Sequence, residues 1–310
     1  MNTTQILYSA GVILVTAGIL LLAKTFYARV AAYDLDHELT EADNPAVGTA
    51  LFGYLAGIVI VLAALLSTEP LETEGDSGMV NDLIELIAYG ILAICLLKLA
   101  GFVNDRFILH RFENKKELVD DRNVGAGAVL CGSYLASGLV IAGALAGRMD
   151  GEIFGTEATQ MEVVAQELGV ALTFFVLGQI VLVIFGYVYQ AVQKQDVLDA
   201  IEQDYEVNGV KHGGNAAAGI AFGASLTAVG LVLFGASRSD FTGWGDNLLT
   251  FGVSAGLALV LLPVWRIFVD RVMLQKADLA KEIYEDKNVN AALIEGVSLL
   301  GLAVFLLFAV

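Results

Sequence analysis

The feature that most constrains this chain is a series of eight long apolar stretches separated by polar segments. Each is close to the roughly 20 residues that a helix needs to cross the apolar core of a bilayer. Such helices satisfy their own backbone hydrogen bonds, so they are stable in lipid. The predicted spans are residues 5–28, 45–67, 82–103, 124–147, 161–190, 215–237, 247–269 and 289–310.

Composition and charge exclude several other classes of protein. Apolar residues make up 57% of the 310 residues and charged residues only 16%, whereas soluble domains have about 25% charged residues. The net charge of -17 argues against a nucleic-acid partner, because binding phosphates requires a basic patch. The predicted fold class is therefore all-α, a polytopic membrane helix bundle of eight transmembrane helices, and its first partner is the lipid bilayer.

The distribution of basic residues predicts the topology. Of the 17 Lys and Arg residues, all but Arg148 and Arg238 lie in or beside the segments that follow the first, third, fifth and seventh spans. Basic loops stay in the cytoplasm. We therefore expect a multi-pass protein of the inner (plasma) membrane, with four larger cytoplasmic loops and both termini outside. No Lys or Arg precedes the first stretch, which favours a retained span over a secretory signal.

An internal repeat is anchored on four asparagines. Each predicted cytoplasmic loop ends in an Asn that opens a helix rich in small residues, at Asn44, Asn123, Asn215 and Asn288. Small residues occupy two fixed positions after each Asn. Four residues later they are Gly48, Gly127, Gly219 and Ala292, and thirteen residues later they are Gly57, Ala136, Ala228 and Gly301. The residues three positions before each Asn are Glu41, Asp120, His212 and Glu285. In three copies an acid and an aliphatic residue precede the Asn at a fixed distance, as Glu38-Leu39, Glu117-Leu118 and Glu282-Ile283, while the third copy has an insertion there.

The repeat predicts four copies of one two-helix hairpin. Because each copy contains two spans, all copies point the same way across the membrane. Two copies make a four-helix membrane unit, so we expect a first unit over residues 1–150 and a second over residues 151–310.

With these motifs the chain resembles the bacterial inner-membrane proteins of domain-of-unknown-function family 350, also called uncharacterised protein family 0719. The resemblance rests on Asp43-Asn44, Asp121-Arg122-Asn123, Asp286-Lys287-Asn288 and the Gly/Ala-rich helices after them. It implies that two family units are fused in tandem, because usual members are about half this length. It implies no established activity, and it leaves association into homo-oligomers open.

The repeated Asn residues have three interpretations. Asn is a favourable N-cap, because its side chain accepts hydrogen bonds from the free N–H groups of a first helical turn. Alternatively, the four side chains converge and form a cytoplasmic mouth with the acids Glu41, Asp120 and Glu285, since rings of carboxylates select cations in many pores. A docking surface is the third interpretation.

The small residues predict close helix packing. Pairs of glycines four residues apart let helix backbones approach in lipid, and we expect the even-numbered spans to form an inner layer with the bulkier odd spans facing lipid. The expected packing residues are Gly48, Gly53, Gly57, Gly127, Gly219, Gly223 and Gly301.

Glu295 is the clearest single candidate for a functional residue. An ionisable group inside a span is costly, so a functional role is the default hypothesis for it. The equivalent residues of the other copies are Leu51, Leu130 and Phe222. Lys98 lies at a similar depth from the same side, so a structural Glu295–Lys98 pair is the alternative.

No catalytic constellation, metal-ligand spacing or cofactor motif stands out, so we expect neither an enzyme nor a metal site. Two functional hypotheses remain. The first, favoured by the repeat symmetry, the Asn and acid residues and Glu295, is a channel or transporter for small cations. The second is a non-transporting scaffold that docks a cytosolic or membrane partner through helical extensions at residues 105–120, 194–206 and 270–286. An open polar path would favour transport, and a dry Gly/Ala-packed centre would favour the scaffold.

Overall fold

The computed structural model describes residues 3–67, 76–111, 113–147, 160–193, 195–207, 209–273 and 277–309. Eight helices in this part are long and apolar enough to cross a membrane, which confirms the predicted class of an all-α polytopic bundle. They are α1 (Thr3–Val30), α3 (Pro45–Ser67), α4 (Asp76–Val103), α5 (Val124–Ala146), α6 (Gln160–Val192), α8 (Ala216–Ser237), α9 (Trp244–Phe268) and α10 (Val289–Ala309).

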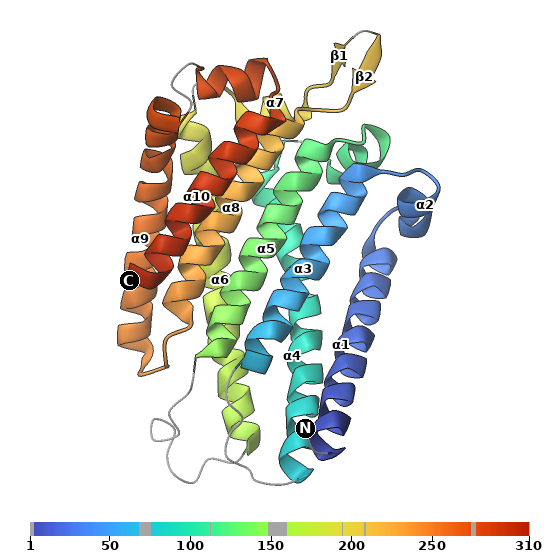
Figure 1. The fold of residues 1–310 in the computed structure, drawn as a ribbon, viewed down its shortest axis with the longest axis vertical. Helices are drawn as coiled ribbons and strands as arrows, with labels where there is room; N and C mark the ends of the chain where they lie inside the picture. Colours follow the sequence, from blue (N-terminus) through green and yellow to red (C-terminus); the bar gives the residue numbers. More distant parts are fainter. Residues whose placement is uncertain are drawn as a thin grey trace.

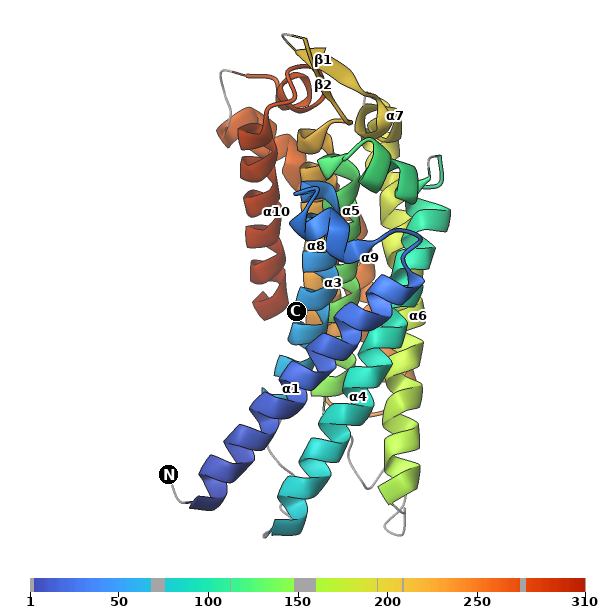
Figure 2. The same ribbon diagram turned by 90° about the vertical axis from the view of Figure 1, so that its right-hand side faces the viewer.

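The eight helices form two layers (Figures 1 and 2). One layer is a row in the order α3, α5, α8, α10, in which each helix packs along its neighbour. The other layer contains α1, α4, α6 and α9, which pack across the back of that row. The Asn-containing turns therefore lie side by side at one end of the row, while the first described residues of α1 lie at the opposite end.

The inner layer differs from the prediction at its edges. Within the spans, 89% of α5 and 72% of α8 is buried, but only 44% of α3 and 33% of α10. The fifth span, α6, was expected to face lipid, but 50% of it is buried. The second, fourth, sixth and eighth spans (α3, α5, α8 and α10) do form one layer, which we call the inner row. The expectation that all four are buried was wrong for α3 and α10, because each end helix of a row has a neighbour on one side only.

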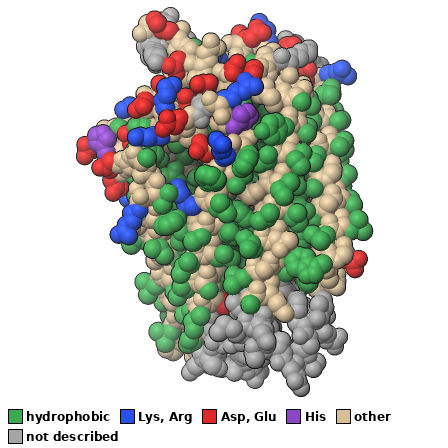
Figure 3. Space-filling view, turned by 180° about the vertical axis from the view of Figure 1, so that it is seen from behind, with side chains coloured by type: hydrophobic (Ala, Val, Ile, Leu, Met, Phe, Trp, Pro, Cys, Tyr) green, Lys and Arg blue, Asp and Glu red, His purple; other side chains and the backbone are tan. Residues whose placement is uncertain are grey.

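We call the end of the bundle that carries the Asn turns the cap end. It contains the short helices α2 (Leu35–Thr40) and α7 (Val197–Glu202), the π-helical turns η1 (Asn104–Ile108), η2 (Lys116–Asp120), η4 (Val269–Met273) and η5 (Lys281–Glu285), and the antiparallel strands β1 (Tyr205–Val207) and β2 (Val210–His212). Charged side chains gather at this end, above a wide apolar band (Figure 3).

The cap end corrects the predicted continuous helical extensions. Where a helix was expected over residues 194–206, the structure has the short α7 and then a β-hairpin in the third copy. Gly209 has φ +79° in the hairpin turn, a conformation that glycine adopts without steric cost. The insertion that interrupts the repeat is therefore this hairpin.

Small residues set the spacing of the inner row. A Cβ at Gly132 would collide with the Gly223 carbonyl, and a Cβ at Gly53 with the Cys131 backbone. The next equivalent pair is Ala224 and Gly296, where an added Cβ would lie 2.8 Å from the Ala224 Cβ. Backbones at these junctions are in direct contact, as small-residue interfaces in lipid permit.

The outer faces of α3 and α10, at the two ends of the row, lack small residues at the equivalent positions. The residues that occupy the junction positions there are Phe52 on α3 and Val297 on α10, and they are 63% and 60% exposed. Bulky apolar residues on an outer face suit contact with lipid. The terminal copies thus resemble the modified end repeats of stacked repeat proteins.

Candidate functional site

Each of the four Asn residues follows a residue in the left-handed backbone conformation. The φ angle is 48° at Asp43, 49° at Arg122, 53° at Lys287 and 59° at Gly214. This conformation costs roughly 1–2 kcal/mol for a residue with a Cβ, and it commonly ends a helical turn. The chain reverses there and places each Asn directly before a long helix.

The Asn side chains cap the helices that follow them. Oδ1 of Asn123 accepts a hydrogen bond from the N–H of Ala126 at 3.1 Å. Equivalent bonds join Asn215 to Ala218 (3.1 Å), Asn44 to Ala46 (3.0 Å) and Val47 (3.3 Å), and Asn288 to Asn290 (3.0 Å). All four side chains therefore have N-cap geometry.

The amide nitrogen of the same side chain bonds in a second direction, to a Glu six residues earlier. Nδ2 of Asn123 donates to Glu117 Oε2 at 2.7 Å. The equivalent pairs are Asn44 with Glu38 and Asn288 with Glu282, both at 2.8 Å. The acids that pair with the Asn residues are thus those of the acid-plus-aliphatic motif.

In three copies the amide also bonds to the next copy. Nδ2 of Asn44 donates to the carbonyl of Leu118 (2.8 Å), that of Asn123 to Ile201 (2.6 Å) and that of Asn215 to Ile283 (2.8 Å). We call these the junction bonds. The three donors are almost completely buried, so each junction bond joins two neighbouring copies of the Asn motif away from water.

The predicted cytoplasmic mouth was wrong in its geometry. The four Asn side chains lie along a row, one per junction, and do not surround an axis. Glu41, Asp120 and Glu285 are exposed at the cap end, and Glu41 bonds to His37 at 3.1 Å. A row arises because each copy packs on the preceding one with its inner helix, so the amides point along the layer.

Glu295 pairs with Arg266, so the predicted partner Lys98 was wrong. Nε of Arg266 on α9 donates to Oε1 of Glu295 on α10 at 2.7 Å. The Glu295 side chain is fully buried and that of Arg266 is 14% exposed. The reason is the layer order: α9 packs against α10, whereas Lys98 lies on α4, which packs against α1, α3 and α5.

Lys98 lies instead against aromatic rings of the first half. Its Nζ is 4.1 Å from the centre of the Tyr27 ring and 5.9 Å from that of Tyr54. Tyr54 in turn packs edge-on against Tyr134, with ring centres 5.4 Å apart. The negative faces of these rings stabilise the ammonium group.

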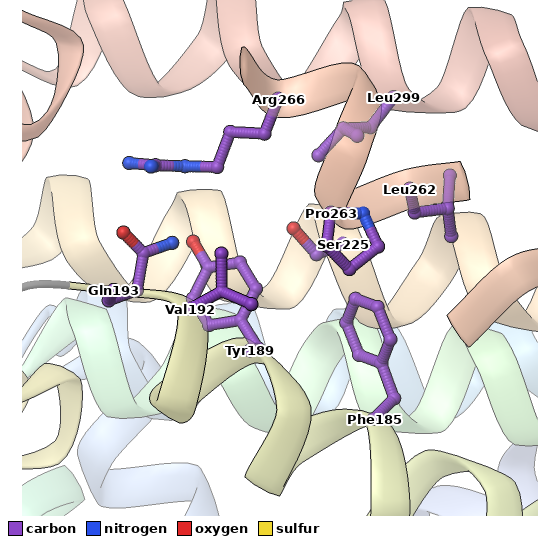
Figure 4. Close-up of a pocket in the computed structure, with 9 residues that line it drawn as sticks. All are labelled: Phe185, Tyr189, Val192, Gln193, Ser225, Leu262, Pro263, Arg266 and Leu299. Atoms are coloured by element: carbon purple, nitrogen blue, oxygen red, sulfur yellow. The ribbon is translucent and has the colours of Figure 1, made fainter. Parts of the chain in front are cut away.

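A small cavity adjoins the Arg266–Glu295 pair, between α6, α8, α9 and α10 (Figure 4). Its volume is about 10 Å³ and its lining includes Tyr189, Gln193, Ser225 and Arg266. The lining is apolar elsewhere. Polar and charged side chains of α6, α8 and α9 thus meet at one place between the helices.

Electrostatics at the cap end follows burial and pairing. Burial raises the pKa of Glu117, while the hydrogen bond from Asn123 and the charge of Lys116 oppose that rise. Asp196 is partly desolvated, but its bonds to Arg111 and to the Asp199 N–H hold its pKa below the usual value. Arg111 joins Asp196 at 2.5 Å and Asp199 at 3.0 Å, and this connects the segment after η1 to α7.

Two groups of site residues were missed from the sequence. Glu38, Glu117 and Glu282 were recognised only as part of the repeat, although their fixed distance of six residues from an Asn was the signal for a paired side chain. Arg266 entered the sequence-based prediction only as one of the basic residues that indicate the membrane topology. In the described part of the chain no three metal-ligating side chains gather.

The fold and site define a polytopic α-helical membrane protein with an internally repeated cap. The sequence profile of one family, described as Domain of Unknown Function (DUF350), matches the chain twice, over residues 1–145 and 163–310. The chain belongs to this family, as two tandem units. No curated protein and no solved structure matches it.

Proposed function

We propose that this protein is a non-transporting membrane scaffold whose cap end faces the cytoplasm and docks a partner protein. The proposal rests chiefly on the backbone-to-backbone packing of the inner row. It includes no catalytic step, and it places the protein in the inner membrane with both termini outside, as the distribution of Lys and Arg favours.

The packing of the row supports a role without transport. At the Gly53–Cys131 and Gly132–Gly223 junctions there is no room even for an added Cβ. An ion path needs a continuous series of polar groups or water across the apolar band. Two cavities among the described residues have volumes of about 10 and 90 Å³, and the larger includes the exposed cap-end residues His110 and Arg111 in its lining. Neither crosses the bundle.

The cap end supports docking. Its short elements are held in place by the junction bonds, by Arg111 with two aspartates, and by Lys287, whose Nζ lies 3.9 Å from the Tyr205 ring centre. A fixed surface with both signs of charge gives a partner orientation and specificity. Because the motif is repeated, similar elements lie side by side along the cap end.

Transport of small cations remains a second candidate because of one observation. Ionisable groups buried inside a span are costly and suggest a functional site by default. Glu295 and Arg266 are two such groups. Among the described residues a pair of such groups is found only in the second half, which would make any transport site asymmetric.

The docking proposal is tested by photo-crosslinking in native membranes. A photoreactive residue placed at Glu41, Asp120 or Glu285 is expected to crosslink one and the same protein. Lipid-facing Leu249 and Phe305, 68% and 74% exposed, are the controls and should crosslink none. Reversing the charge of the neighbouring cap residues should abolish the crosslink. Equal crosslinking from cap and lipid-facing positions, or none from the cap, would contradict docking.

A further inference from the structure

The ion pair in the second half leaves polar atoms without protein partners. Glu295 uses Oε1 for Arg266, but its Oε2 is buried and has no hydrogen-bond partner among the described residues, and the same is true of Arg266 Nη2. A buried polar group left without a hydrogen bond destabilises the folded state, and a charged group does so more strongly. A folded protein rarely retains several such groups in one place without something bound there.

Gln193 adds two further atoms to this group. Its side chain lines the cavity beside Arg266, the residue is 8% exposed, and neither its Oε1 nor its Nε2 has a protein partner in the described structure. Figure 4 shows Gln193, Tyr189 and Arg266 around the same space. Pro263, also in the lining, has no N–H, so it leaves one α9 carbonyl without its helical bond.

These groups fit water. They include donors on Arg266 and Gln193 and acceptors on Glu295 and Gln193, and a buried water typically makes about three hydrogen bonds. The cavity volume of about 10 Å³ is close to the 10–15 Å³ that one water molecule requires. A larger organic ligand does not fit this space.

Tyr189 lies between this cavity and a second cavity at the cap end. It is shared by the lining of the small cavity and by that of the second cavity, of about 90 Å³, which also includes His110, Arg111 and Gln190. His110 and Arg111 are exposed at the cap end. The Tyr189 ring stacks on Phe222 with centres 4.8 Å apart, and it forms the partition between the two spaces.

We propose that the Arg266–Glu295 pair is a water-binding site, filled from the cap end past Tyr189. Ordered water completes the hydrogen bonds of Glu295 Oε2, Arg266 Nη2 and Gln193. The proposal is independent of the scaffold function, since a docking protein and a transporter could each contain such a site.

The test is hydroxyl-radical footprinting by X-ray radiolysis of the full chain in nanodiscs, with oxidation sites located by mass spectrometry. Radicals formed from bound water oxidise the side chains next to that water. Leu299 lines the cavity, and its matched control is Leu226, which stands eleven residues after Asn215 as Leu299 does after Asn288. We expect Leu299 to be oxidised at least several-fold faster than Leu226. Equal rates would show that the site is dry and would overturn the proposal.

Two variants test the polar groups and the route. Gln193→Leu should lower the oxidation of Leu299 and leave Leu226 unchanged. After transfer into ¹⁸O water, Tyr189→Ala should shorten the delay before labelled oxygen reaches Leu299. Tyr187→Ala, which changes the outer cavity alone, should not shorten that delay. Unchanged ¹⁸O exchange in Tyr189→Ala would refute the route, and the comparison of Leu299 with Leu226 needs no substitution at all.

Discussion

The two family units of this chain treat a buried cation in different ways. The first unit holds Lys98 against the faces of Tyr27 and Tyr54. The second holds Arg266 against the carboxylate of Glu295. Both units share the Asn caps, the left-handed residue before each cap and the small residues between inner helices. The shared features build the bundle, whereas each unit stabilises its buried cation with different side chains.

The two solutions have different energetic consequences. A cation on aromatic faces leaves no charge behind when it is removed. Removing one partner of a buried ion pair leaves an uncompensated charge in a medium of low polarity. Substitutions in the second unit should accordingly have the larger effects.

The largest effect is expected at Glu295. Glu295→Ala should lower the free energy of unfolding by about 3–5 kcal/mol, because Arg266 is then buried without its partner. Lys98→Met should cost no more than about 2 kcal/mol, the upper range of a desolvated cation–π contact. Unfolding by SDS titration in mixed micelles measures both. The double variant Arg266→Met with Glu295→Met should recover much of the loss, and failure to recover would show that the pair is not the cause.

The next largest effect is the difference in stability loss between an inner and a terminal copy of the Asn cap. Asn123→Ala removes a cap, a bond to Glu117 and a junction bond, and we expect a loss of about 2–4 kcal/mol. Asn288 is half-buried and has no junction bond among the described residues, so Asn288→Ala should cost only about 1 kcal/mol. Equal losses in the same unfolding assay would mean that the junction bond contributes nothing.

The third effect separates the inner junctions from the ends of the row. Gly132→Ala places a Cβ against the Gly223 carbonyl, and such overpacking should cost about 1–3 kcal/mol or more. Gly301→Ala is the control, because a Cβ there meets nothing within 4 Å. It should be neutral, or stabilising by up to about 1 kcal/mol through helix propensity. A melting temperature that falls equally in both variants would refute the junction argument.

The smallest effect concerns pH. Burial raises the pKa of Glu117 above its ordinary value of 4.5, so the folded state holds this proton more tightly than the unfolded state. The contribution is therefore fully present below the unfolded pKa and is lost as pH rises through the folded pKa. Glu117→Gln keeps an acceptor for Asn123 but cannot titrate. The stability of wild type relative to the variant should therefore fall as pH rises through that range. A pH-independent difference would contradict the assignment.

Much of this architecture could be predicted from the sequence, because span length and apolar content are local properties of each segment. The small residues at fixed places after each Asn indicated the close packing found at Gly57, Gly127 and Gly219. The same prediction was wrong for Gly48 and Gly301, where an added Cβ would meet nothing closer than 3.9 Å, because these positions face away from the neighbouring helix of the row. The partner of Glu295 could not be predicted, since it depends on which helix of the second layer lies against α10. The hairpin of β1 and β2 was seen only as an interruption, because short strands joined by a tight turn carry little periodicity.

The arrangement of the caps shows the same limit. The position of each Asn before a helix follows from its own sequence, and its N-cap bonds are local. Whether the four Asn residues form a ring or a row depends on how whole hairpins pack. That is determined by the Gly and Ala contacts between α3, α5, α8 and α10, which no single segment encodes.

Whether the bundle conducts ions is tested most directly by measuring ion flux through proteoliposomes. Purified folded protein would be compared with empty vesicles for K⁺, Na⁺, H⁺ and a polyamine, with Glu295→Gln measured beside wild type. We predict no flux above that of empty vesicles for either protein. Flux in wild type that Glu295→Gln abolishes or alters would contradict the scaffold proposal and place Glu295 on a transport path.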